Sequence, residues 1–394
     1  MVVTIVVLLI LAGISISLVV GDNGLIRKSK DAKKQYEEAQ ANELAMTDEA
    51  GDLIDEIVTG NLKETKPYLP SGDYTKVPGT SLDNGLVIAD KKGNEYVWVE
   101  VPRNAEVVYK TAGLNITEFS ATELASIKTD LINYATDYRK SGYDDTWYSG
   151  CGISDLDTYT DKYNKMLKSV YQNGGFWIGR YEIGIDENTI RNNSNKSTTT
   201  NHTPVIKANK IPYNYITCSQ SESLAETFAP SGYTSSLLFG LQWDLVLKHL
   251  ETKGTNPGTT ATSLQNAIKS NSTDWGNYKN ANFDITNTDA MYSEDLGASW
   301  KKVSEKADKK YQKASNEGVL LTTGAEARNS MLNICDLAGN LYEWTLEKTS
   351  FSSSPCAYRG GDYNGSGSDV PASYRIDRIT TYSYDSNGAR VSLY

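Results

Sequence analysis

The first segment of the chain, Met1–Val20, contains no charged residue. A helix rises about 1.5 Å per residue, so about 20 apolar residues match the roughly 30 Å hydrocarbon layer of a bilayer. A cleaved signal peptide has a different pattern, because it has a basic start, a shorter apolar stretch and a small-residue cleavage site. We therefore predict a membrane-spanning hydrophobic helix over residues 1–21.

A polar helix is predicted to follow the span. Residues 22–60 are rich in charge and carry an intermittent apolar stripe, which is typical of an amphipathic stalk helix; its members are Tyr36, Ala39, Leu44, Leu53, Ile54, Ile57 and Val58. The apolar stretch, the break GDNGLI and the Lys-rich helix together resemble the N-terminal spine of type IV pilins and pseudopilins, in a form common in gram-positive bacteria. This resemblance implies contacts with pilus subunits. It also implies display of the remaining chain on the outer cell surface or pilus of a bacterium.

Charge and composition exclude several classes of protein. The net charge is -10, and no dense basic face is evident, so we expect no nucleic-acid partner. His202 and His249 lie far apart in unrelated contexts, and the cysteines lack CxxC spacing, so a zinc site or a Cys/His nucleophile is not expected. We predict that the four cysteines are buried free thiols. A disulfide between Cys335 and Cys356 is the alternative if the protein is exported.

The region after the helices divides into a linker and a domain. Residues 61–85 are rich in Pro, Gly, Ser and Thr, which predicts a linker. Residues 85–102 predict a β-hairpin with its turn at Lys92-Gly93-Asn94. Further along, the sequence predicts a strand between glycines at 174–184 and a helix at 235–254 that ends on a basic turn and Gly. Helix-like patterns also occur at 122–140 and 161–173. The mixture indicates an α+β domain over residues 86–394.

Six motifs in this domain follow one another in a characteristic order: VWVEVP, GGFWIGRYEIG, GLQWDLVLKHL, NICDLAGNLYEWTLE, YRGGDY and NGARVSL. Their order and spacing resemble the formylglycine-generating enzyme/sulfatase-modifying family, whose domain is a variant of the C-type lectin fold. The most specific part is DLAGNLYEWT followed by RGG and a terminal GxR. The resemblance implies a C-type lectin-like domain behind the long N-terminal helix.

The motif DLAGNLYEWT brings two carboxylates to a turn. Gly339-Asn340 predicts the turn, and Asp336 and Glu343 flank it, a pattern of oxygen ligands that can hold calcium. By resemblance, a structural Ca²⁺ would use the Asp336 and Glu343 side chains with the Gly339 and Leu341 carbonyls. The alternative is a turn in which backbone amides or an arginine such as Arg359 satisfy both carboxylates.

Catalysis is where the sequence departs from the family. The aerobic enzymes bind copper through a Cys pair just after the GG of the motif, since thiolates are the soft ligands that Cu(I) prefers. In this chain the matching stretch reads GGDYNGSGSDVPASYR, and no cysteine follows Cys356. We therefore expect no copper and no formylglycine-generating activity, and we predict that the protein is not an enzyme.

The C-terminal segment, residues 359–394, has an unusual composition. Residues 362–387 lack Lys, Glu, Gln, Met and Trp. The segment resembles the variable region of retroelement-diversified proteins, which lies C-terminal to a GG-type motif of the same fold and varies at adenines of Asn codons. The resemblance implies a constant framework, formed by Arg359, Gly360, Gly361, Arg375, Gly388 and Arg390. It also implies variable positions that bind the ligand: Asp362, Asn364, Gly365, Ser366, Ser368, Asp369, Ile376, Asp377, Tyr382, Tyr384 and Asp385. The alternative is an ordinary solvent-facing loop region, which favours small polar residues.

Tyrosine suits such a binding surface, and the chain has 26 Tyr against 6 Phe. The leading hypothesis is therefore a surface-displayed adhesin, pilin-like and anchored by its N-terminal helix. Its ligand would be a protein or glycan on another cell, a phage or a host surface. Two alternatives are open: a sulfatase-modifying-family enzyme with altered chemistry, and a minor pilin head with a structural role.

Overall fold

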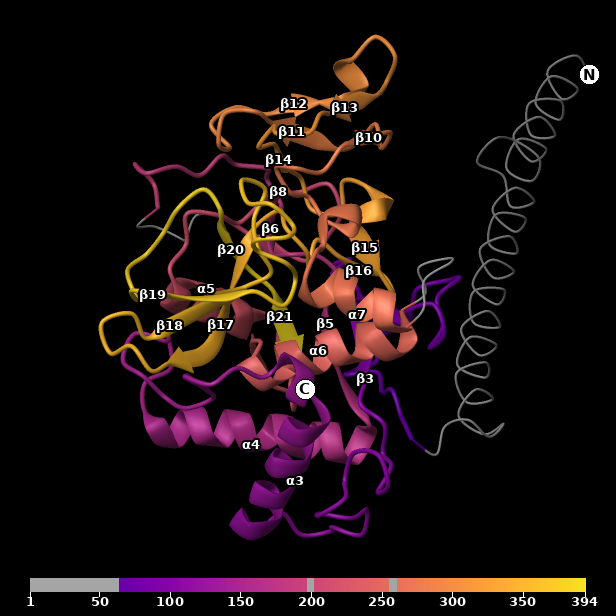
Figure 1. Ribbon diagram of the computed structural model, residues 1–394, viewed down its shortest axis with the longest axis vertical. Coiled ribbons are helices and arrows are strands. Elements are labelled where there is room, and N and C mark those ends of the chain that lie inside the picture. The colour runs from indigo at the N-terminus through magenta and orange to yellow at the C-terminus, as the bar shows by residue number, and fades with distance from the viewer. Residues whose placement is uncertain (1–63, 197–201, 255–260) are drawn as a thin grey trace, which may run out of the picture. The chain divides into compact units, whose positions relative to one another are not determined.

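The computed structural model describes residues 64–196, 202–254 and 261–394 (Figure 1). Contacts group residues 63–394 into one compact unit. The predicted membrane helix at 1–21 and the stalk helix at 22–60 lie outside the described residues. Within the described ranges, no helix has both the length and the apolar character needed to cross a membrane.

A six-stranded antiparallel sheet forms the centre of the unit. Its order is β1-β2-β3-β5-β21-β9, with bounds β1 Tyr74–Lys76, β2 Val87–Asp90, β3 Glu95–Glu100, β5 Gly175–Gly179, β21 Val391–Leu393 and β9 Ser235–Leu237. The predicted hairpin is confirmed, since β2 and β3 pair in antiparallel register. Trp98 on β3 lies opposite Trp177 on β5, and their rings meet edge to face at 4.9 Å.

A second sheet carries the C-terminal segment. Its order is β19-β18-β17-β20, with β4 also paired to β17; the bounds are β4 Tyr143–Asp144, β17 Tyr342–Thr349, β18 Cys356–Arg359, β19 Arg375–Arg378 and β20 Asn387–Ala389. The β17/β20 pair is parallel and the other pairs are antiparallel. After β20 the chain crosses directly into the first sheet as β21, so the C-terminal segment belongs to both sheets.

Short strands complete the unit in three small sheets and one hairpin. They are β6 Gly184–Ile185, β7 Pro204–Val205, β8 Ile211–Pro212, β10 Phe283–Ile285, β11 Met291–Ser293, β12 Lys301–Lys302, β13 Tyr311–Lys313, β14 Leu320–Leu321, β15 Ser330–Met331 and β16 Ile334–Cys335. The predicted linker needs correction in its described part, because it contains β1. Thr65 is also buried and accepts a hydrogen bond from the Trp98 indole at 2.8 Å.

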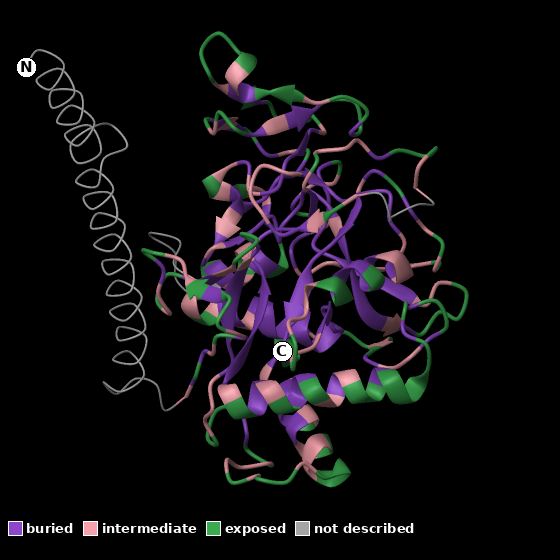
Figure 2. Cartoon of the chain, turned by 180° about the vertical axis from the view of Figure 1, so that it is seen from behind, coloured by how far each residue is buried: buried purple, intermediate pink, exposed green. Residues whose placement is uncertain are grey.

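The described residues form five α-helices: α3 Ala121–Tyr134, α4 Leu156–Asn173, α5 Cys218–Ala225, α6 Gly240–Lys253 and α7 Ala261–Lys269. Of these, α4, α5 and α6 contact the sheets, whereas α3 packs against α4 and α6, and α7 packs against α6. Short 3-10 helices are η1 Thr136–Tyr138, η2 Glu226–Phe228, η3 Thr273–Trp275, η4 Val303–Glu305 and η5 Ala327–Asn329. The sequence sets the limits of α4, since Asp155 caps its first turn and Gly174 ends it with φ 68°. One face of α4 is buried and the other exposed, whereas α6 is buried on most sides (Figure 2).

Two predicted elements are shorter than expected. The predicted helix at 235–254 begins as strand β9, and α6 starts only at Gly240. The predicted strand at 174–184 is interrupted after Gly179, because the backbone bends there before β6. In both places a strand and its neighbour share one apolar run, so periodicity alone cannot locate the break. The α+β class is confirmed.

Candidate functional site in the C-terminal segment

The C-terminal segment is fully folded. It leaves β18, forms a loop over 360–374, returns along β19 beside β18, forms a second loop over 379–386, and ends in β20 and β21. Gly360 and Gly361 have φ of 91° and 78°, which L side chains rarely adopt. A Cβ on Gly361 would lie 2.2 Å from the Val370 carbonyl oxygen, so this position admits only glycine without rearrangement.

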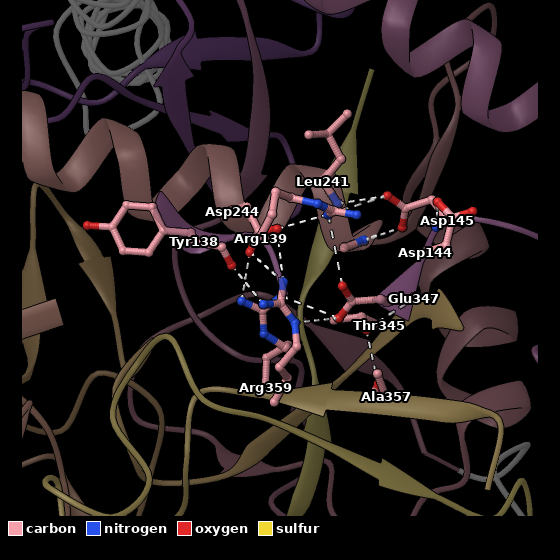
Figure 3. A network of polar contacts seen from close by, with 12 residues as sticks. Tyr138, Arg139, Asp144, Asp145, Leu241, Asp244, Thr345, Glu347, Ala357 and Arg359 are labelled. Carbon is pink, nitrogen blue, oxygen red and sulfur yellow. Dashed lines mark hydrogen bonds and ion pairs between the residues drawn. The ribbon is translucent and has the colours of Figure 1, made fainter. Parts of the chain in front are cut away.

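Buried arginines fix both ends of the first loop. Arg359, before the loop, donates to Asp244 at 2.9 Å (Figure 3). Arg375, after the loop, donates to the same carboxylate at 2.7 Å. Arg375 also pairs with Glu347 at 3.1 Å. Burial would raise the pKa of Glu347, but Arg375, Arg359 and Arg139 outweigh it and lower the pKa. The carboxylate is therefore ionised, and the two ends of the loop share one buried ion cluster.

A second buried ion pair closes the segment. Arg390 holds Glu343 through two nitrogens, at 2.6 Å and 3.0 Å, and donates to the Gly179 and Cys335 carbonyls at 2.9 Å and 2.7 Å. Gly388 packs against Leu341, where a Cβ would meet the leucine side chain at 2.6 Å. All the expected framework residues therefore lie in the interior.

The expected variable positions differ in exposure. Asn364, Ser368, Asp369 and Tyr384 are exposed, and Gly365, Ser366, Ile376, Asp377 and Tyr382 are half-buried. Two expectations need correction, because Asp362 and Asp385 are buried. Asp362 accepts from the Gly365 amide at 2.8 Å and Asp385 accepts from the Tyr363 hydroxyl, so both hold loops together. Burial raises the pKa of Asp362 to about 6.

Aromatic side chains gather along the second loop. Tyr382 and Tyr384 stack with ring centroids 4.9 Å apart, and Tyr384 is 51% exposed. The Arg378 guanidinium lies over Tyr382 at 5.1 Å and over Tyr358 at 4.8 Å. These four residues, Tyr358, Arg378, Tyr382 and Tyr384, are called the tyrosine patch below. Cation–π contacts and ring stacking hold the patch in one arrangement, which lowers the entropy lost when a ligand binds.

A surface cavity adjoins the first loop. It has a volume of about 380 Å³, and its lining includes Ser368 and Asp369 of the segment together with Lys140 and Lys269 from outside it. Lys140 lies over the Tyr143 ring at 5.6 Å. The first loop thus borders a cavity that is lined by both positively and negatively charged side chains.

The turn expected to hold calcium is present. Gly339 and Asn340 adopt φ of 75° and 59°, in the left-handed region that Gly and Asn enter more readily than other residues. Both Glu343 oxygens are held by Arg390, and Asp336 accepts from the Gly324 amide at 2.6 Å through one oxygen. The other Asp336 oxygen is buried without a hydrogen-bond partner. Calcium binding by Glu343 would require it to leave Arg390, and in the described ranges no three Asp, Glu, His or Cys side chains are grouped to hold a metal.

Sequence reasoning missed Glu182, whose side chain holds this turn through hydrogen bonds rather than as part of a metal-binding group. Glu182 is fully buried and accepts from the Asn340 side chain at 2.7 Å and from the Leu341 amide at 3.0 Å. Burial, together with Asp336 and Glu343, raises its pKa well above the usual range. The sequence signal was its place in GGFWIGRYEIG, where one acid interrupts an apolar run. The arginine at the turn is Arg390 rather than Arg359.

The cysteines are free and buried, as expected. The Cys335 to Cys356 pairing is absent, and the Cys335 thiol instead lies 3.8 Å from the Asn333 carbonyl. His249 is buried, and its Nδ1 accepts from the Glu100 amide at 3.3 Å. Comparison of the chain with protein-family models and with curated proteins finds no match.

Proposed function

We propose that the protein is a ligand-binding protein whose C-terminal segment forms the binding face. One observation carries the proposal. Buried ion pairs fix the ends of the first loop of this segment, and the two loops expose the side chains of Asn364, Ser368, Asp369 and Tyr384. Binding surfaces on a rigid scaffold commonly have this arrangement, because the fold tolerates change at the tips. The tyrosine patch would supply rigid contact area, and the polar tips would supply adaptable hydrogen bonds.

The fold that we propose is the formylglycine-generating enzyme-like C-type lectin fold. The mixed sheets, the buried Arg359 and Arg390, and the left-handed glycines after β18 support it. Diversification by a retroelement is part of the same proposal. Its support is the composition of residues 362–387 together with the interior position of every framework residue.

The N-terminal part of the proposal is surface display. The apolar segment 1–21 and the stalk 22–60 would anchor the protein in a bacterial membrane or a pilus, with the domain outside the cell. Protease treatment of intact cells tests this orientation. Loss of the domain from intact cells supports surface display, and a domain left uncut contradicts it.

The binding proposal is tested by the double variant Tyr382→Ala/Tyr384→Ala. The matched control is Phe351→Ala, because Phe351 is an aromatic residue 59% exposed outside the variable segment. Labelled wild-type and variant proteins would be applied to a glycan array and to intact host and bacterial cells. We expect binding by the wild type and the control, and at least a tenfold loss for the double variant. Equal binding by all three proteins contradicts the proposed face.

Diversification has its own test in the flanking DNA. A near-copy of the region encoding residues 359–394, differing at adenines and accompanied by a reverse transcriptase gene, is the expected finding. Without this pair of features the segment would be a fixed binding surface, and the binding experiment would still apply.

A further inference from the structure

The walls of the cavity beside the first loop are joined to that loop by hydrogen bonds. One wall is the end of α7, where the Ile268 carbonyl accepts from the Ser373 amide at 3.2 Å and the Lys269 carbonyl accepts from the Ser373 hydroxyl at 3.3 Å. The other wall follows η1, where the Tyr138 carbonyl accepts from the buried Arg375 guanidinium at 2.7 Å. The cavity of about 380 Å³ is therefore formed before a ligand binds, which lowers the cost of binding.

The lining of this cavity is more basic than the rest of the chain. It contains four basic and two acidic residues, whereas the whole chain has a net charge of -10. The six are Arg139, Lys140, Lys269, Arg375, Asp137 and Asp369. Ion pairs engage three of them. Arg139 and Arg375 pair with Asp244 in the buried ion cluster, and Asp137 lies 3.5 Å from Lys248.

Two lysines and one aspartate of the lining are left without such a partner. Among the residues that the structure describes, Lys140, Lys269 and Asp369 form no ion pair. Lys140 instead lies over the Tyr143 ring at 5.6 Å. All three charged side chains are exposed, so a ligand can reach them. Two ammonium groups against one carboxylate give the cavity an excess of one positive charge.

Hydroxyl and aromatic groups complete the lining. Ser368 supplies an exposed hydroxyl, and the half-buried Tyr374 supplies a ring. A sugar ring has hydroxyls around its edge and an apolar C–H face, so it can use both kinds of group. An acidic sugar adds a carboxylate or a sulfate, and each of these anions can accept charge-assisted hydrogen bonds from two lysines. The volume lies near the lower end of the range for small-ligand sites, which suits one sugar ring.

We propose that this cavity is a subsite for an acidic sugar of the ligand, whose carboxylate or sulfate contacts Lys140 and Lys269. The inference rests on the proposed function, because the same ligand contacts the binding face of the C-terminal segment. The two lysines lie outside residues 359–394, whereas Asp369 lies within them. The lysines therefore bind the anion whatever the sequence of the segment, and the residue at position 369 sets how strongly the cavity attracts it.

The test compares acidic sugars with neutral sugars. The full chain in detergent would be applied to an array of glucuronic acid, galacturonic acid, N-acetylneuraminic acid and a sulfated galactose, with glucose and galactose on the same linker. We expect the wild type to bind at least one acidic sugar about tenfold more strongly than the neutral ones. Lys140→Ala/Lys269→Ala should lose about tenfold of this binding, because it removes the donors to the anion.

Two further variants complete the test. Lys92→Ala/Lys302→Ala is the matched control, because it removes two exposed lysines outside the cavity and changes the net charge equally. It should bind acidic sugars as the wild type does. Asp369→Asn removes the opposing carboxylate and should bind them about two- to fivefold more strongly. This variant reports on the same charge balance even if the lysine variant fails to fold.

The outcomes separate this inference from the proposed function. The acidic-sugar subsite is overturned if the wild type binds no acidic sugar, or binds acidic and neutral sugars equally. Unchanged binding by Lys140→Ala/Lys269→Ala, or weaker binding by Asp369→Asn, also overturns it. The binding face survives each of these results if Tyr382→Ala/Tyr384→Ala still loses binding to cells. Unchanged cell binding by that variant contradicts the binding face instead.

Discussion

Replacing Arg375 tests how the C-terminal segment is held in the domain. Arg139, Arg359 and Arg375 face Asp145, Asp244 and Glu347 in one buried cluster, so positive and negative side chains are equal in number. Arg375→Met removes one positive charge and leaves one carboxylate uncompensated. Breaking a buried ion pair in this way costs about 3–5 kcal/mol. For a domain of this size, that corresponds to a fall in melting temperature of about 4–7 °C.

The matched control lies on the same strand. Arg378 is half-buried, lies over tyrosine rings and faces away from the ion cluster, so Arg378→Ala is expected to cost about 1 kcal/mol or less. A second variant restores the charge balance: Arg375→Met/Glu347→Gln should recover more than half of the stability lost by Arg375→Met. Urea unfolding followed by tryptophan fluorescence measures all three, because Trp98, Trp177, Trp243 and Trp344 are buried.

The reasoning fails on either of two results. If Arg375→Met costs no more than Arg378→Ala, the ion cluster does not hold the segment. If the double variant is less stable than Arg375→Met, charge imbalance is not the source of the loss, and the lost hydrogen bonds or packing would be responsible instead.

Three further predictions follow from single residues. Burial lowers the pKa of His249 to about 3, so as the pH falls below 6.5 the imidazole is protonated in the unfolded chain before it is protonated in the folded domain. Acid therefore stabilises the unfolded state of the wild type. At about pH 4.5 we expect the acid-induced loss of unfolding free energy to be about 2.7 kcal/mol smaller in His249→Asn than in the wild type, as measured by urea unfolding across pH. If the Asp336 turn holds calcium, EGTA lowers the wild-type melting temperature and leaves Asp336→Asn unchanged, whereas an unmoved wild type argues against calcium. Gly361→Ala should be destabilised by at least 2 kcal/mol more than Gly79→Ala. The two glycines have φ of 78° and 77°, but only at Gly361 would a Cβ meet other atoms, and thermal unfolding that gives equal values would refute this steric argument.

Local signals predicted much of the fold. The hairpin β2/β3 follows from alternating residues around a Gly turn, and most of α4 follows from the helical pattern at 161–173. The order of strands could not be read in the same way, because β20 and β21 pair with strands far away in the chain. Local propensity contains no information on such pairings, which depend on the packing of the whole domain.

In the candidate site, too, some residues could be predicted from the sequence and others could not. Framework arginines and glycines were predicted from motifs, and the structure buries them. Asp362 and Asp385 were expected as ligand-binding positions because the segment resembles the variable region of diversified proteins, but both are buried and each accepts a hydrogen bond from within the segment. The partners Asp244 and Glu347 were missed, since nothing in the sequence of a helix or strand indicates which distant arginine a given acid will face.

Because β21 follows the C-terminal loops in the chain, the domain is complete only if the reading frame is kept through those loops. This strand lies downstream of residues 359–386 in the chain, yet it pairs with β5 on one side and β9 on the other. A frameshift or stop codon introduced upstream would remove it and divide the six-stranded sheet into two parts. Such products would fold poorly and be degraded, so only in-frame sequences of the C-terminal segment would yield a folded domain.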